Sequence, residues 1–252
     1  MKIVVKVGTG VLTRENGTLD GSSIVHLVSA LAGLMQRGHQ VVLVSSGAVG
    51  AGVSVLGLPS YPQELSLKQA CAAVGQTRLM QTYENLFNHF DVEVAQLLLT
   101  AEDLKRRRRN VQATVMRLFE HGGIIPIVNE NDTVSVEELK FGDNDILSVH
   151  MARLAGADAL FILTSVGGLY PPGGSRDAII PRVEDVDAVL AFAEEDRGRF
   201  SMGGMSAKLL AVREAVNSGI GTYIVHGRHP ERISLLLEGG AEDAGTFFVP
   251  KA

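Results

Sequence analysis

The sequence predicts an α/β fold in which a mainly parallel sheet carries helices on both faces. Short apolar segments, which are typical of buried strands, alternate along the chain with longer segments of helical periodicity. The chain has 252 residues, of which 46% are hydrophobic, so it is long enough to bury a large core. In parallel sheets, ligands bind where the strands end. Functional residues are therefore expected at the carboxyl ends of the strands.

Seven short apolar runs are expected to form strands, because each is bounded by glycine or polar residues and is too short for a typical helix. The first run holds Lys6 and ends at the glycine-containing segment 8–10. The second leads directly into the small residues of 45–52, where a helix is expected to begin. The expected strands cover residues 3–7, 40–44, 92–98, 124–128, 159–163, 221–225 and 246–249.

Between these strands, apolar residues recur at the spacing of a helix. In the first such segment Ile24, Leu27 and Leu31 fall on one stripe, and Gly38 ends the pattern. The turn-rich segment 171–182 is interpreted as an excursion or hairpin. Besides the helix that begins within 45–52, helices are expected over residues 22–37, 67–90, 111–120, 146–154, 186–192, 209–217 and 230–237.

The composition argues against several classes of protein. The net charge of -5 gives the whole chain no electrostatic reason to bind nucleic acid or an anionic membrane. The basic run 105–109 has no interleaved aromatic residues, so a solvated helix face is favoured over a nucleic-acid patch. The single cysteine, Cys71, excludes an intrachain disulfide and is interpreted as a core residue. With no signal peptide and no membrane span in the sequence, a cytoplasmic location is expected.

Polar and glycine-rich segments follow four of the expected strands, at 8–10, 46–52, 129–133 and 164–170. Their convergence at one edge of the sheet predicts a binding site. Lys6 either meets a phosphate there or reaches from an edge strand to water, and the strand alone does not decide between the two. In the second segment a helix start would suit an anion, with close packing of helix on sheet as the alternative.

The residue types at these strand ends favour phosphoryl transfer. Lys6 and Lys208 each adjoin a glycine-rich segment, and the middle of the chain contributes Asp132, Asp143 and Asp145. Lysines and backbone amides can offset the charge that spreads over a transferring phosphoryl group. The sequence has no P-loop motif, no His-Glu-x-x-His, no cysteine pair and no dinucleotide fingerprint, so P-loop, transition-metal and nicotinamide chemistry are not indicated.

Taken in order, these motifs resemble the glutamate 5-kinase family of the amino-acid kinase superfamily over essentially the whole chain. The Asn-Glu-Asn-Asp and Gly-Asp-Asn-Asp motifs point to this branch over the acetylglutamate, carbamate, uridylate and aspartate kinases. The resemblance implies one domain over 1–252, a three-layer α/β/α sandwich around a mainly parallel eight-stranded sheet. The matching segments are 5–9 (VKVGT), 45–49 (SSGAV), 73–76 (AVGQ), 128–132 (VNEND), 142–145 (GDND), 168–170 (GLY) and 203–208 (GGMSAK).

The resemblance also implies ATP-dependent phosphorylation of the L-glutamate γ-carboxylate for proline biosynthesis, with Mg²⁺ bridging phosphate oxygens. Lys6 and Lys208 would flank the phosphoryl group, and Asp145 would hold both lysines. Asp132 would clamp the substrate ammonium rather than act as a base, because the attacking carboxylate is already ionised at neutral pH. The glutamate-binding residues would be Ser46, Asp132 and Asn144. The phosphate- and ATP-binding residues would be Lys6, Gly8, Thr9, Gly47, Ala48, Thr164, Ser165, Met202, Gly203, Gly204, Met205, Ser206, Ala207 and Lys208.

Three features depart from the usual pattern of this family. Ser165 stands where aspartate is frequent, with Gly168 nearby, and Met202 and Ala207 stand where threonine is frequent. The chain ends at Ala252, so the C-terminal PUA domain of many members is expected to be absent. Two alternatives stay open, a catalytically silent amino-acid sensor and a kinase for another carboxylate such as N-acetylglutamate. Assembly into a homodimer or homotetramer and inhibition by L-proline are further expectations.

Overall fold

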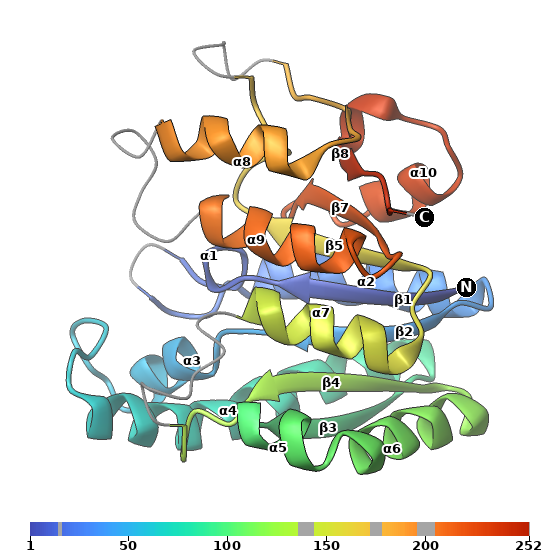
Figure 1. Ribbon diagram of the computed structural model, residues 1–252. Coiled ribbons are helices and arrows are strands. Elements are labelled where there is room, and N and C mark those ends of the chain that lie inside the picture. Colours follow the sequence, from blue (N-terminus) through green and yellow to red (C-terminus); the bar gives the residue numbers. More distant parts are fainter. Residues whose placement is uncertain (15–16, 136–143, 172–177, 196–204, 252) are drawn as a thin grey trace.

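The computed structural model describes residues 1–14, 17–135, 144–171, 178–195 and 205–251 (Figure 1). In this part of the chain eight strands form one sheet, in the order β3-β4-β2-β1-β5-β7-β8-β6. Neighbouring strands are parallel except β7 and β8, which are antiparallel. The predicted mainly parallel eight-stranded sheet is therefore confirmed. The strands are β1 (Lys2–Val7), β2 (Gln40–Ser45), β3 (Glu93–Leu99), β4 (Ile124–Glu130), β5 (Ala159–Thr164), β6 (Arg182–Val183), β7 (Gly221–His226) and β8 (Gly245–Phe248).

Helices cover both faces of this sheet. Helices α6 to α9 share an apolar cluster with one face, and α2, α4 and α10 share a cluster with the other. Figure 1 shows α7 and α9 in front of the sheet and α2 behind it. None of the described helices has both the length and the apolar character needed to cross a bilayer. The helices are α1 (Thr9–Leu12), α2 (Gly21–Gln36), α3 (Ala48–Val55), α4 (Leu65–Phe87), α5 (Ala101–Arg106), α6 (Arg108–His121), α7 (Asn144–Ala155), α8 (Val186–Glu195), α9 (Met205–Val216) and α10 (Arg232–Leu237), with short 3₁₀ turns at Asn88–Phe90 and Glu242–Ala244.

Strand β1, inside the sheet, shows how the side chains are divided between the two faces. Ile3 and Val5 belong to the apolar cluster that contains α2 and α4, whereas Val4 belongs to the cluster that contains α7 and α9. Side chains alternate between the faces of a strand, so Lys6 shares the face of Val4. The polar end of Lys6 is therefore directed toward α7 and α9.

Three segments are of interest because the sequence reads them differently or incompletely. Thr9–Leu12 forms one helical turn after β1, where only a loop is predicted. The basic run 105–109 is divided between α5 and α6, and its side chains are exposed, as predicted for a solvated face. In the described part of 171–182 the N–H of Ile180 donates to the carbonyl oxygen of Leu169 at 2.7 Å, and Arg182–Val183 pairs in parallel with β8, so the excursion or hairpin stays a prediction. Residues 172–177 lie outside the described part of the chain.

Helices α3 and α4 approach each other closely because glycine stands at their contact points. A Cβ added to Gly52 would lie 1.9 Å from the backbone oxygen of Cys71, and one added to Gly75 would lie 1.8 Å from that of Ala48. The small residues of the segment after β2 therefore do serve close packing, between two helices. Cys71 is fully buried at this contact, and burial raises the pKa of its thiol, which confirms a core role.

Candidate active site

Two lysines from distant parts of the chain meet one buried carboxylate. Nζ of Lys6 lies 2.5 Å from Oδ1 of Asp145, and Nζ of Lys208 lies 3.2 Å from Oδ2 of the same residue. Lys6 is 1% exposed and Asp145 is 0% exposed. Two ammonium groups and one carboxylate carry a net charge of +1 when these three groups are counted alone, and ammonium groups suit an anionic ligand. The three residues predicted to act on the phosphoryl group are thus together, although their catalytic roles stay predictions.

These three residues come from elements that begin or end at one edge of the sheet. Lys6 is the penultimate residue of β1, Asp145 lies in the first turn of α7, and Lys208 lies in the first turn of α9. Figure 1 shows β1 pointing toward the side of the molecule where α7 and α9 begin. Parallel connections bring helix starts to the strand ends, which explains the meeting. Asp143, which the sequence groups with Asp145, lies outside the described residues.

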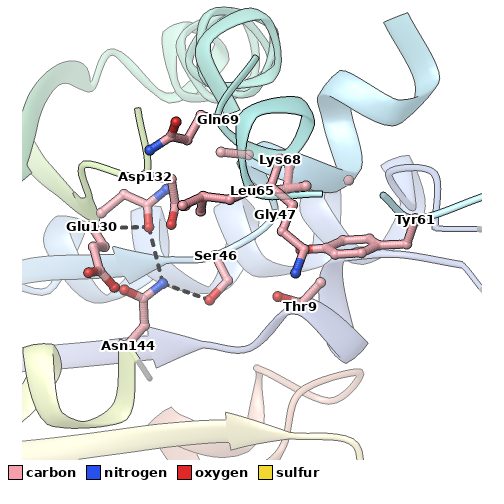
Figure 2. A pocket seen from close by; sticks show the side chains of 14 residues that line it. Thr9, Ser46, Gly47, Tyr61, Leu65, Lys68, Gln69, Glu130, Asp132 and Asn144 are labelled. Atoms are coloured by element: carbon pink, nitrogen blue, oxygen red, sulfur yellow. Dashed lines mark hydrogen bonds between the residues drawn. The ribbon is translucent and has the colours of Figure 1, made fainter. Parts of the chain in front are cut away.

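A polar pocket adjoins the ion cluster that Lys6, Lys208 and Asp145 form (Figure 2). Asn144 lines the pocket and directly precedes Asp145, and Thr9 lines it three residues after Lys6. The cavity has a volume of 180 Å³, against about 30 Å³ for one water in the liquid, so it accommodates a small polar ligand. The lining residues are Thr9, Ser46, Gly47, Ala48, Val49, Gly50, Tyr61, Leu65, Lys68, Gln69, Asn129, Glu130, Asp132 and Asn144.

Asn144 is oriented by hydrogen bonds from its amide nitrogen (Figure 2). Nδ2 donates to the hydroxyl oxygen of Ser46 at 2.8 Å, to Oδ1 of Asn129 at 3.1 Å and to the backbone oxygen of Ser45 at 3.3 Å. Asn129 in turn donates to Oε1 of Gln76 at 3.0 Å. Oδ1 of Asn144 is buried and has no hydrogen-bond partner among the described residues. This network leaves an acceptor on Asn144 and the O–H of Ser46 for a ligand.

The start of α3 supplies backbone donors to the pocket. Gly47 precedes this helix with a φ of 102°, in the left-handed region that favours glycine. Residues 47–50 line the pocket, and the first N–H groups of a helix have no acceptor within the helix. These donors and the positive end of the helix dipole favour an anion. Gly47 and Ala48 therefore line the pocket, and their role as a phosphate cradle stays a prediction.

Gly8 contributes space rather than a free donor. Its backbone N–H donates to the carbonyl oxygen of Leu163 at 3.4 Å, as part of the contact between β1 and β5. A Cβ added to Gly8 would lie 3.5 Å from Nζ of Lys6. Glycine at this position thus leaves room for a ligand next to the Lys6 amine.

The residues predicted to contact the nucleotide follow β5, the strand next to β1. Thr164 is the buried last residue of β5, and Ser165 is exposed directly after it. The second predicted segment reaches the first turn of α9, where its last four residues are partly buried. Met202, Gly203 and Gly204 lie outside the described residues. Because β2 and β5 flank β1 on opposite sides, the end of β5 lies across β1 from the strand that leads into α3, and contact of these residues with a nucleotide stays a prediction.

Gly168, near the departure from the family pattern at Ser165, has a packing role. A Cβ added to it would lie 2.6 Å from the hydroxyl oxygen of Thr246. The N–H of Leu169 also donates to this hydroxyl, at 2.7 Å. The close approach to β8 thus requires glycine here.

Three residues of the pocket, Tyr61, Lys68 and Gln69, are not singled out by the sequence. They come from the connection between α3 and α4 and from the first turns of α4. Partial desolvation by the neighbouring residues and the negative charge of Asp132 raise the pKa of the Tyr61 phenol above its ordinary value, although its side chain stays in part exposed. Glu130 also lines the pocket and accepts a hydrogen bond from the Ser135 hydroxyl at 2.6 Å. Unlike Tyr61, Lys68 and Gln69, Glu130 stands in the segment 129–133, one of the polar strand-end segments that the sequence marks.

Comparison with known families and relatives gives a consistent result. Residues 1–226 match the family described as amino acid kinase family. The glutamate 5-kinase of Geobacter sp. (strain M21) is 45% identical over 255 residues, which cover 99% of this chain and 68% of that protein. The glutamate 5-kinase of Clostridium acetobutylicum is 44% identical over 256 residues, covering 99% of this chain and 95% of that protein.

Solved structures of more distant proteins share the fold. Carbamate kinase from Giardia lamblia bound to AMP-PNP superposes with a TM-score of 0.70 at 18% identity, over 99% of this chain and 98% of the other. An isopentenyl phosphate kinase in a substrate complex superposes with a TM-score of 0.67 at 19% identity, over 98% of both chains. At such identities the likeness concerns the fold alone, and it confirms the fold implied by the sequence motifs.

Proposed function

This chain belongs to the amino acid kinase family and to its glutamate 5-kinase branch, and on that premise we propose how its site performs the reaction. The enzyme transfers the γ-phosphoryl group of ATP to the γ-carboxylate of L-glutamate, which gives L-glutamyl 5-phosphate, the first step of proline biosynthesis. The observation that carries the proposed site is the meeting of Lys6 and Lys208 at Asp145, next to a polar pocket.

Lys6 and Lys208 offset the charge of the phosphoryl group as it moves. In this reaction class negative charge spreads over three phosphoryl oxygens while donor and acceptor stay in line. A cation about 4 Å from such a charge contributes roughly 4 kcal/mol at an effective dielectric constant of about 20. Asp145 holds both amines in place before ATP arrives, so little reorganisation is needed during transfer.

L-glutamate occupies the pocket of Figure 2. Asp132 clamps its ammonium group, and Asn144 adds a hydrogen-bond acceptor. The O–H of Ser46 holds the γ-carboxylate toward the ion cluster, and the N–H groups of Gly47 and Ala48 cradle the incoming phosphoryl group. The γ-carboxylate is already ionised at neutral pH, so it attacks without a general base.

ATP binds along the end of β5 and the start of α9, through Thr164, Ser165 and the segment 202–208. Both carboxylate oxygens of Asp145 face lysines, and the described residues hold no group of three or more His, Cys, Asp or Glu suited to a metal ion. On the family resemblance, Mg²⁺ would enter with ATP, and when bound it would neutralise part of the phosphate charge.

An assay of ADP release that is coupled to a reporter reaction tests the proposal. With ATP, Mg²⁺ and L-glutamate we expect steady ADP release, and hydroxylamine should trap the acyl phosphate as a hydroxamate. Replacing glutamate by N-acetylglutamate should reduce the rate to that without acceptor, and a chelator should abolish it. Glutamate binding without ADP release would instead support the silent sensor, and a faster rate with N-acetylglutamate would support the sister kinase.

Regulation and assembly extend the proposal on the family resemblance alone. We infer that L-proline competes with glutamate, and that the chain forms a homodimer or homotetramer in the cytoplasm. Initial rates with added proline test the first inference, and sedimentation equilibrium tests the second.

A further inference from the structure

Lys68 brings a positive charge into the pocket that faces the proposed glutamate. It lies in the first turn of α4, is partly buried and lines the pocket. Figure 2 shows its side chain extending from α4 beside Tyr61 toward Thr9, on the side away from Glu130 and Asp132. Lysine side chains usually reach solvent, so a lysine directed into a pocket requires a partner.

No carboxylate within the described part of the chain pairs with Lys68. Glu64, one helical turn earlier, is the position that most often pairs with a lysine on a helix. Its carboxylate accepts a hydrogen bond from the Ser66 hydroxyl instead. The two carboxylates of the pocket, Glu130 and Asp132, line its other side. The pocket thus has a negative side and a positive side, a polarity that matches a zwitterionic ligand.

L-glutamate carries three charged groups, and the site described above accounts for two of them. The ammonium is placed at Asp132, and the γ-carboxylate is directed to the ion cluster. Lys6 and Lys208 both contact Asp145 and do not line the pocket, so neither is placed to receive the α-carboxylate. An α-carboxylate in the pocket needs a cation to balance its desolvation.

We propose that Lys68 binds the α-carboxylate of the acceptor and so restricts the enzyme to acceptors whose α-carboxylate is free. This inference rests on the proposed function, because it assigns a specificity-determining residue to the same pocket. The α-carbon of the substrate then lies between Lys68 and Asp132, with its carboxylate on the first and its ammonium on the second. An acceptor with a neutral α-substituent leaves the lysine without its counter-charge and binds weakly.

Steady-state kinetics with two acceptors test the inference. L-isoglutamine keeps the ammonium and the γ-carboxylate of glutamate but carries an uncharged α-carboxamide. Lys68→Met should raise KM for glutamate by roughly 10- to 100-fold, the range expected for losing a charge-assisted hydrogen bond. It should leave kcat and the KM for ATP within a few-fold and change the weak use of isoglutamine little. Lys68→Arg should retain most of the preference for glutamate.

Lys105→Met is the matched control, because it removes the same charge from an exposed site on α5. It should leave both acceptors unaffected. Equal losses with glutamate and isoglutamine, or a loss confined to kcat or to the KM for ATP, would assign Lys68 to the phosphoryl group and overturn the inference. Normal kinetics of Lys68→Met would overturn it as well. Far-UV circular dichroism of each variant excludes misfolding as the cause of any change.

Failure of the proposed function gives a result that differs from failure of the inference about Lys68. If the unaltered enzyme releases no ADP with glutamate, the proposed reaction is wrong, and calorimetry then compares the binding of glutamate and isoglutamine directly. Glutamate binding that weakens at least tenfold in Lys68→Met, with no change for isoglutamine, supports the role of Lys68 in a binding protein as well. Equal affinity of the unaltered protein and of Lys68→Met for glutamate contradicts a role of Lys68 in binding.

Discussion

Replacing Asp145 by asparagine leaves the Lys6 amine buried next to a neutral amide of the same size. Lys6 is 1% exposed, so its charge has no route to solvent without movement of β1 or α7. At an effective dielectric constant of about 20, contacts of 2.5 and 3.2 Å correspond to about 7 and 5 kcal/mol of attraction. The desolvation of the three groups offsets most of this gain, and breaking such a buried pair costs about 3–5 kcal/mol of stability.

Urea unfolding followed by far-UV circular dichroism measures this loss, since the chain has no tryptophan to report by fluorescence. With an m value of about 3 kcal/mol/M, the midpoint should fall by roughly 1–2 M. The double variant Lys6→Met, Asp145→Asn removes the Lys6 charge together with the Asp145 carboxylate. It should therefore be more stable than the sum of the two single changes predicts, by about 1–3 kcal/mol. A loss below about 1 kcal/mol for Asp145→Asn, or strict additivity in the double variant, would refute the reasoning.

Three further changes test other parts of the molecule. Lys208→Ala should lower kcat by roughly 100-fold or more, as for loss of a preorganised donor. It should destabilise the fold less than Asp145→Asn does, because Lys6 still neutralises the carboxylate. Steady-state rates and melting curves check the two effects, and a near-normal kcat would remove Lys208 from the site. Gly75→Ala should lower the free energy of unfolding by about 1–3 kcal/mol or more, because the added Cβ would lie 1.8 Å from a backbone oxygen. The control Gly33→Ala has open space for its Cβ and should raise the free energy of unfolding by about 0.5–1 kcal/mol. Equal urea midpoints for the two variants would contradict the close contact of α3 and α4. Asp20→Ala removes the N-cap of α2 and should cost about 0.5–2 kcal/mol at neutral pH, whereas Asp20→Asn should keep most of the cap. Hydrogen bonds from Ser22 and Ser23 lower the pKa of the Asp20 carboxyl below 3.8. The stability that this carboxylate adds to the fold is therefore complete above pH 3.8 and is lost as the pH falls through the folded-state pKa. A difference in unfolding free energy between the natural chain and Asp20→Ala that stays constant down to the lowest pH of the folded protein would contradict this.

Much of the scaffold could be predicted from local patterns. The apolar runs and the helical stripes reproduce the strands and most helices to within a few residues, because the period of two in a strand and of 3.6 in a helix are properties of the backbone. The four polar segments at strand ends also mark the correct edge of the sheet. The same alternation that buries Val4 and Val5 on opposite faces directs Lys6 toward α7.

Other features depend on contacts that no local pattern encodes. The family motif suggests that Asp145 holds two lysines, but only the packing of α7 and α9 on one face of the sheet brings the three groups within ion-pair distance. Gly8 illustrates the same limit, because its N–H is used by Leu163 of a strand that follows much later in the chain. The antiparallel place of β8 next to β7 likewise has no signal in the spacing of its residues.

The sequence by itself thus determined the fold class, the edge of the sheet that carries the site and the family to which the chain belongs. The tertiary structure alone decided which charges share a cavity, and Lys68 is the clearest case. On a helix of mixed polarity a lysine is ordinarily a solvent residue, and its spacing is compatible with any outward direction. Its position opposite Asp132 arises because α4 packs against α3 through glycine, and such a contact is set by the shapes of two surfaces rather than by residue spacing.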